Sequence, residues 1–225
     1  ENFESYTNGN LNGQNGWTAT GNSDRVQVAN SSPLTYPGYA SGSKYVNVTR
    51  RGDYFAGSFP FFTYNTPDDP YKSFIGSTSL SPGTATTFFM SFLVMVPNTT
   101  GTVDDGNARP TVALRTSSGN NIANFYIADN GGPGVRFGIK KDESTDAVYA
   151  SGTYGINTTY LVVIRYDLRT SNAFDDRMYL WINPSLTSQP TTASANVTIT
   201  SGSDDVSGSI NSIQFLQENN SATAS

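Results

Sequence analysis

The chain has 225 residues, a formal net charge of −5, and neither cysteine nor histidine. These values exclude disulfides, thiolate metal sites, cysteine nucleophiles and every mechanism that needs histidine. The acidic balance and the absence of a basic run also argue against nucleic acid as a partner.

One large all-β domain is expected from length and composition, since 225 residues fit a single sandwich or barrel. The 13 Tyr, 13 Phe and 2 Trp are enough to fill a core between two sheets. No window repeats apolar residues at helical spacing, and no apolar run approaches the roughly 18 residues that a membrane helix needs. We therefore expect almost no helix and no membrane insertion.

Strands are predicted wherever a short β-branched or aromatic run is bounded by Gly, Pro, Asn or Asp. In chain order, the first six are Arg25–Ala29, Lys44–Thr49, Tyr54–Gly57, Lys72–Ser79, Thr87–Val96 and Thr111–Arg115. The next seven are Ile122–Ala128, Val135–Lys140, Ala147–Ala150, Thr159–Asp167, Arg177–Ile182, Ala195–Thr200 and Ser209–Leu216. So many short strands with turn residues between them predict a sandwich of two antiparallel sheets.

Two of these strands indicate which residues enter the core. Arg177–Ile182 alternates, with Met178, Leu180 and Ile182 on one face and Tyr179 and Trp181 on the other. The run at 160–164 is continuously apolar, which is typical of a central strand that is covered on both faces. The predicted core includes Phe88, Phe92, Val94, Leu161, Val163, Leu180 and Ile213.

Five segments, taken in order, resemble the concanavalin A-like lectin/glucanase superfamily, as found in bacterial exported proteins. They are Glu1–Trp17, Phe88–Val96, Thr158–Leu168, Arg177–Pro184 and Ile210–Gln217. The resemblance implies one jelly-roll sandwich that spans residues 1–225. Because these motifs are packing motifs, they specify a fold better than a function.

The end of the chain departs from that family. The family has a further strand that pairs beside the N-terminal strand, whereas Asn219–Ser225 shows no apolar alternation. Either the domain lacks its last strand or another segment fills that edge. An N-terminal strand at Glu1–Tyr6 with an open edge is the consequence that we expect.

Catalysis is not expected. Glycosidases of this superfamily carry an E-x-D-x-x-E strand, whose carboxylates lie about 5–5.5 Å apart for a retaining mechanism. The chain lacks that motif, and its glutamates, Glu1, Glu4, Glu143 and Glu218, all lie outside the central candidate strands. We therefore predict a protein without catalytic residues and without a required cofactor.

An aromatic-rich region is the best candidate for a binding surface. Tyrosine combines a flat apolar ring with a polar tip, which suits stacking on sugar rings or burial in a protein interface. We expect a carbohydrate-binding or interface platform that includes Tyr36, Tyr39, Tyr54, Tyr64 and Tyr71.

Acidic doublets in the predicted loops have two interpretations. Asp commonly begins turns and keeps a surface soluble. Calcium, however, takes six to eight oxygen ligands from carboxylates and loop carbonyls, and Asp104, Asp105 and Asn107 are the best candidates for it.

Two functions stay open on these grounds. The first is a secreted, non-catalytic, lectin-like module that binds polysaccharide or mediates surface adhesion. The second is a structural subunit of an extracellular filament, sheath or surface layer, which would assemble from neighbouring copies through open sheet edges. Export is expected because the chain begins at Glu1 without an initiator Met or apolar leader, as does a mature chain or an excised domain.

Overall fold

The computed structural model describes residues 3–19, 26–31, 33–39, 42–48, 69–74, 86–97, 110–141, 146–169, 175–200 and 209–216. Within these ranges every regular element is a β-strand, apart from a single 3-10 turn, η2 (Thr192–Ser194). The all-β expectation is confirmed. None of the described segments forms a helix with the length and apolar character to cross a membrane.

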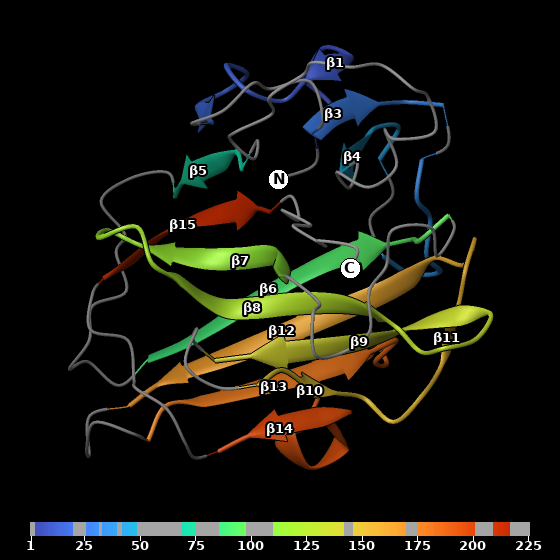
Figure 1. Cartoon of the computed structure of the whole chain (residues 1–225), viewed down its shortest axis with the longest axis vertical. Coiled ribbons are helices and arrows are strands. Elements are labelled where there is room, and N and C mark those ends of the chain that lie inside the picture. Colours follow the sequence, from blue (N-terminus) through green and yellow to red (C-terminus); the bar gives the residue numbers. More distant parts are fainter. Residues whose placement is uncertain are drawn as a thin grey trace, which may run out of the picture.

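The strands form three antiparallel sheets of three, eight and four strands (Figure 1). The three-stranded sheet has the order β1 (Gly9–Asn10), β3 (Val26–Ala29), β4 (Tyr45–Val48). The eight-stranded sheet has the order β10 (Val148–Tyr149), β9 (Gly134–Lys140), β8 (Asn121–Asp129), β7 (Pro110–Thr116), β15 (Ile210–Phe215), β5 (Tyr71–Ser73), β2 (Trp17–Thr18), with β11 (Tyr154–Gly155) also beside β9. The four-stranded sheet has the order β14 (Val197–Ile199), β13 (Arg177–Ile182), β12 (Tyr160–Leu168), β6 (Thr86–Val94).

Most of the predicted strands are present. Every one that falls within the described residues is found, with its ends shifted by a few residues. The prediction at Tyr54–Gly57 lies outside the described residues, and Lys72–Ser79 is described only as far as residue 74. The two-residue strands β1, β2 and β11 were not predicted, because two residues are too few to show a period.

The predicted N-terminal strand at Glu1–Tyr6 is wrong over its described part. Residues 3–6 form a turn, in which the Tyr6 backbone N–H donates to the Phe3 carbonyl at 3.0 Å. Phe3 has a φ of 58°, in the left-handed region and outside the extended conformation of a regular strand. At this edge of the eight-stranded sheet β2 pairs with β5 instead, with Trp17 opposite Lys72.

The eight-stranded and four-stranded sheets pack face to face as a β-sandwich, and they overlie one another in Figure 1. Alternation along each strand directs every second side chain into the space between the sheets. Phe125 and Phe137 enter from the eight-stranded sheet, and Ile164 and Leu180 from the four-stranded sheet. The face assignment predicted for 177–182 is confirmed, since Met178, Leu180 and Ile182 all belong to this core.

Most of the predicted core residues lie in or against the core between the two sheets. Leu180 is fully buried in this core cluster. Four partly buried side chains pack against the cluster, namely Phe88, Phe92, Val94 and Ile213. Leu161 is fully buried, but it lies outside this core cluster.

The prediction for Val163 is wrong, because it is half-buried and lies on the outer face of the four-stranded sheet. The register places Val163 opposite Ser91 and Trp181. Its neighbours Val162 and Ile164 point inward instead. A continuous apolar run conceals this alternation in the sequence.

A second, smaller core lies under the three-stranded sheet. It contains Tyr6, Leu11, Trp17, Val26 and Val28. Phe215 of β15 packs against both cores, and its ring stacks on that of Trp17 with 5.1 Å between centroids. The N-terminal segment is therefore packed onto the end of the sandwich.

Candidate functional site

The outer face of the eight-stranded sheet, which points away from the sandwich core, carries mainly polar and aromatic side chains. Tyr71 of β5 lies opposite Gln214 of β15, which lies opposite Ala113 of β7. On the following strands Asn124 of β8 lies opposite Lys140 of β9. We call this side of the sheet the Tyr71 face. Its middle is buried within the chain, since Asn124, Ala128 and Gln214 are each less than 10% exposed, whereas Tyr71 and Tyr149 are partly exposed. By register and alternation its other members are Ser73, Ser212, Arg115, Asn121, Tyr126, Ala128, Arg136, Gly138 and Tyr149.

Two arginines of the Tyr71 face lie over tyrosine rings. The guanidinium of Arg115 is 4.3 Å from the centroid of the Tyr71 ring, and that of Arg136 is 5.5 Å from the centroid of the Tyr149 ring. Arg115 Nε also donates to the Gly119 carbonyl at 3.3 Å. Because a planar guanidinium stacks on an aromatic ring by a cation–π interaction, both pairs hold a positive charge beside a flat apolar surface.

Gly138 makes room for the second of these pairs. A Cβ at position 138 would lie 2.5 Å from Cδ1 of Tyr149 and 2.9 Å from the Val148 carbonyl oxygen. Both separations are shorter than any van der Waals contact allows. Only glycine lets the Tyr149 ring lie across β9 in this position.

Amide groups lie between the two stacked pairs. The side-chain oxygens of Asn121 and Asn124 are buried and have no hydrogen-bond partner. Asn124 is only 1% exposed. A buried amide oxygen needs a donor, such as a buried water molecule.

Among the residues that the structure describes, the charged side chains of the Tyr71 face are all positive. Its cationic side chains are Arg115, Arg136 and Lys140, and no Asp or Glu belongs to it. A guanidinium such as that of Arg115 is suited to bind carboxylates or sulfates through paired hydrogen bonds.

The outer face of the four-stranded sheet has a different character. Tyr39 shares a hydrogen bond of 3.0 Å with Ser91 of β6, and the rings of Tyr179 and Trp181 are stacked with 5.9 Å between centroids. Arg165 is neutralised here, since its Nε donates to an Asp167 carboxylate oxygen at 2.6 Å. That hydrogen bond raises the pKa of Arg165 above its ordinary value.

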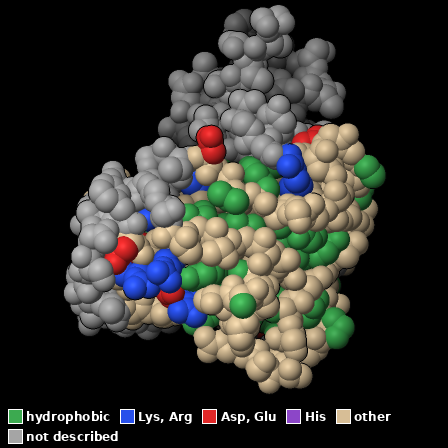
Figure 2. All heavy atoms as spheres, turned by 90° about the horizontal axis from the view of Figure 1, so that it is seen from below, with side chains coloured by type: hydrophobic (Ala, Val, Ile, Leu, Met, Phe, Trp, Pro, Cys, Tyr) green, Lys and Arg blue, Asp and Glu red, His purple; other side chains and the backbone are tan. Residues whose placement is uncertain are grey.

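Figure 2 views the molecule from below, relative to Figure 1. Lys and Arg side chains gather at one side of this view, with Asp or Glu side chains beside them, and uncharged side chains occupy most of the rest. Opposite charges in contact leave little net field for an ionic ligand.

The interior carboxylates are engaged in structural contacts. Asp167 also accepts a hydrogen bond from Thr87, and Asp176 accepts one from the Tyr166 hydroxyl at 3.0 Å. Lys141, which is fully buried, donates to the Asp176 backbone carbonyl at 3.3 Å. In the described part of the chain no three metal-ligating side chains come together.

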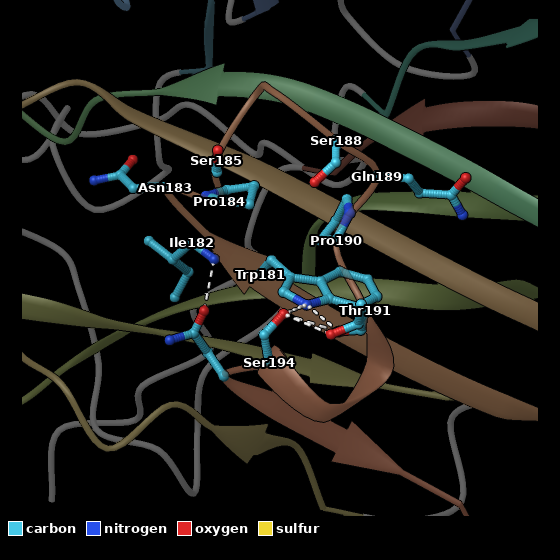
Figure 3. Close-up of a pocket in the computed structure, with 11 residues that line it drawn as sticks. Trp181, Ile182, Asn183, Pro184, Ser185, Ser188, Gln189, Pro190, Thr191 and Ser194 are labelled. Carbon is cyan, nitrogen blue, oxygen red and sulfur yellow. Dashed lines mark hydrogen bonds between the residues drawn. The ribbon is translucent and has the colours of Figure 1, made fainter.

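A pocket of about 390 Å³ lies at the end of β13, under the loop that leads to β14 (Figure 3). We call it the Trp181 pocket. Its lining residues are Trp181, Ile182, Asn183, Pro184, Ser185, Ser188, Gln189, Pro190, Thr191, Ser194 and Asn196. The Trp181 indole N–H donates to the Thr191 carbonyl and to the Ser194 hydroxyl, so the ring anchors the loop.

The tyrosines predicted as one platform do not share one surface where they are described. Tyr71 lies on the outer face of the eight-stranded sheet, whereas the Tyr39 hydroxyl reaches the outer face of the four-stranded sheet. Tyr36 is half-buried, and its carbonyl accepts the Tyr39 backbone N–H in a turn at 3.1 Å. Tyr54 and Tyr64 lie outside the described residues.

The predicted metal ligands Asp104, Asp105 and Asn107 also lie outside the described residues. Sequence reasoning missed the other members of the Tyr71 face, above all Arg115, which stacks on Tyr71, and Asn124. Period-two alternation around the core residue Phe125 could have placed Asn124 on the outer face, but pairing Arg115 with Tyr71 needs the strand order.

No protein-family model matches the chain, and no curated protein matches it either. The function must therefore be argued from the surfaces themselves.

Proposed function

We propose that this protein is a secreted, non-catalytic, lectin-like module that binds polysaccharide across the Tyr71 face. The observation that carries the proposal is the pairing of two tyrosine rings with two arginines around buried amide oxygens that have no donor. Sugars present an apolar C–H face and hydroxyl groups, and this surface offers a complement to both.

The class of ligand that fits this face best is an acidic polysaccharide. Carboxylates or sulfates would accept hydrogen bonds from Arg115, and the apolar faces of the sugars would lie against the rings of Tyr71 and Tyr149. The six strands from β5 to β10 span roughly 24 Å at the usual strand spacing, and the partly exposed tyrosines, Tyr71 and Tyr149, lie on the first and last of them.

The fold expected for such a module supports the proposal. We infer that the two packed sheets are a jelly roll of the concanavalin A-like superfamily, as the resemblance of five segments in the sequence implies. The absence of a catalytic role has separate support, since Asp167 and Asp176 are held by neighbouring side chains. A catalytic pair would need free carboxylates in one cleft.

Binding to immobilised alginate, which carries carboxylates, tests the proposal directly. We expect the natural sequence to bind, and the variants Tyr71→Ala and Arg115→Ala to bind at least tenfold more weakly at constant ionic strength. Matched controls are Tyr39→Ala and Arg169→Ala, because both residues lie beside the four-stranded sheet and away from the Tyr71 face. These variants should bind with an affinity within twofold of that of the natural sequence.

Two outcomes would contradict it. The proposal fails if the natural sequence binds none of a panel of carboxylated and sulfated polysaccharides. It also fails if the control variants weaken binding as much as Tyr71→Ala does. Release of reducing or unsaturated sugar ends during the assay would show that the module is an enzyme after all.

We propose that a calcium ion held by Asp104, Asp105 and Asn107 would be accessory to this function, with a structural role. Treatment with a chelator should then lower the thermal stability while leaving the affinity for alginate unchanged. A chelator that abolished binding would mean that the ion is part of the site.

The alternative is a structural subunit of an extracellular assembly, which was motivated by an open edge at an N-terminal strand. The described part of that segment does not favour it. Tyr6 is 2% exposed within a single chain, and the segment around it is a turn. Light scattering distinguishes the two functions, since we expect the mass of one chain at micromolar concentration.

A further inference from the structure

We propose that the Trp181 pocket is a second saccharide site, specific for a neutral sugar segment. With the Tyr71 face occupied as well, one molecule would hold two glycan chains on opposite sides of the sandwich. The bridging role rests on the proposed function, but the pocket itself can be tested without it.

The lining of the pocket is uncharged. Amides, hydroxyls, two prolines and the indole of Trp181 surround it, and none of its lining residues is Asp, Glu, Lys or Arg. Such a site has no cation to neutralise an anionic sugar, which would lose hydration without gaining an opposite charge. A neutral polyhydroxylated ligand has no such cost and exchanges its hydrogen bonds with water for bonds to the amides and hydroxyls.

Two of the amides have a fixed orientation. Asn183 Oδ1 accepts the Leu161 backbone N–H at 2.9 Å, and Asn196 Oδ1 accepts the Ile182 backbone N–H at 2.8 Å. The bond from Ile182 is drawn in Figure 3. Because each oxygen is held by the backbone, each amide nitrogen is directed away from that bond and offers two N–H donors at a defined place.

The loop over the pocket is also held in place. Ser194 Oγ donates to the Thr191 carbonyl at 2.9 Å, and the same carbonyl accepts the Trp181 indole N–H at 3.1 Å. Pro184 and Pro190 restrict the backbone on either side of the loop tip. A preformed loop avoids the ordering entropy that would otherwise weaken binding.

The pocket has the size of a small-molecule site. Its volume of about 390 Å³ lies within the range of roughly 300–1,000 Å³ that such sites occupy. Trp181 is 2% exposed, so it forms the floor under the loop. The proline rings supply apolar walls for the C–H faces of a sugar, and Ser185, Ser188 and Gln189 supply exposed polar groups.

The two sites lie on opposite sides of the sandwich. Trp181 points away from the core, since its neighbours Leu180 and Ile182 point into it. The Tyr71 face is the outer surface of the other sheet. A ligand at one site therefore does not obstruct the other, and linking two chains gives avidity without a new contact.

The test uses the whole protein and a panel of labelled neutral polysaccharides, namely a β-glucan, a xylan, a galactan and a mannan. Direct titration of each into the protein measures the pocket alone. The blocking variant is Ser188→Trp, which fills the pocket from an exposed loop position, and the matched control is Thr187→Trp, whose position is next in the same loop but outside the lining. We expect the natural sequence and the control to bind one of the four, and the blocking variant to bind it at least tenfold more weakly.

Bridging is measured on alginate beads that carry bound protein. The natural sequence should capture the labelled neutral polysaccharide, and Ser188→Trp should stay on the beads without capturing it. The pocket proposal is overturned if the natural sequence binds no neutral polysaccharide, or if Ser188→Trp binds as well as Thr187→Trp. Loss of alginate binding with neutral binding intact would instead remove the proposed function and leave the pocket proposal standing.

Discussion

The guanidinium of Arg115 lies over the ring of Tyr71, although the two residues belong to strands that are separated by β15. We expect the pair to stabilise the fold as well as to bind ligand. A double-mutant cycle with Arg115→Ala and Tyr71→Ala should give a coupling energy of about 0.5–1 kcal/mol, measured by urea unfolding. Additive single effects would show that the two side chains are in contact without interacting.

Replacing a side chain of β12 or β13 by alanine should lower the free energy of unfolding by an amount that depends on which face of the sheet the side chain occupies. Leu180→Ala leaves a cavity between the sheets and should lower the free energy of unfolding by about 2–5 kcal/mol. Val163→Ala changes a half-buried side chain on the outer face and should cost less than about 1 kcal/mol. Equal costs in chemical denaturation would place Val163 in the interior and contradict the register.

Gly138→Ala should strain the sheet and displace the Tyr149 ring. The new methyl group would meet the ring at 2.5 Å, so we expect a loss of about 1–3 kcal/mol in the free energy of unfolding and weaker binding at the Tyr71 face. Gly155→Ala is the matched control, because its Cβ would meet its nearest atom at an ordinary 3.6 Å. A Gly138→Ala protein as stable as this control would mean that Tyr149 lies elsewhere.

The N-terminal segment should loosen in acid. The Ser43 hydroxyl and backbone N–H donate to the Glu4 carboxylate, and these bonds lower the pKa of Glu4 below its ordinary value of 4.5. A lowered pKa in the folded state means that the stabilisation is present above pH 4.5 and is lost as the pH falls through the lowered value. The fluorescence of Trp17, which lies in the same small core as Tyr6, should report this change.

Glu4→Gln provides the control for that titration. The amide keeps an acceptor oxygen but does not ionise, so the acid transition of the Trp17 signal should be absent in this variant. A transition of the same size and midpoint in both proteins would assign it to another carboxylate.

Sequence alone determined the strands and several of their faces. Period-two alternation at Arg177–Ile182 assigns the inward and outward sides correctly, because it depends on neighbouring residues only. It failed at Val163, where both faces of the strand are apolar, so the pattern lacks the polar positions that would reveal a direction. The strand expected at Glu1–Tyr6 came from the family resemblance instead, and it is wrong where the segment is described, because the residues around Phe3 form a turn.

The candidate site was decided by the tertiary structure. Sequence reasoning named Tyr71, but its contact with Arg115 exists because β15, from the end of the chain, pairs between β5 and β7. Strand order is a long-range property that no local pattern encodes. The unpartnered oxygen of Asn124 and the space that Gly138 leaves for Tyr149 depend on the same order. Local alternation fixes which side chains can leave the core, and only the pairing of distant strands fixes which of them meet.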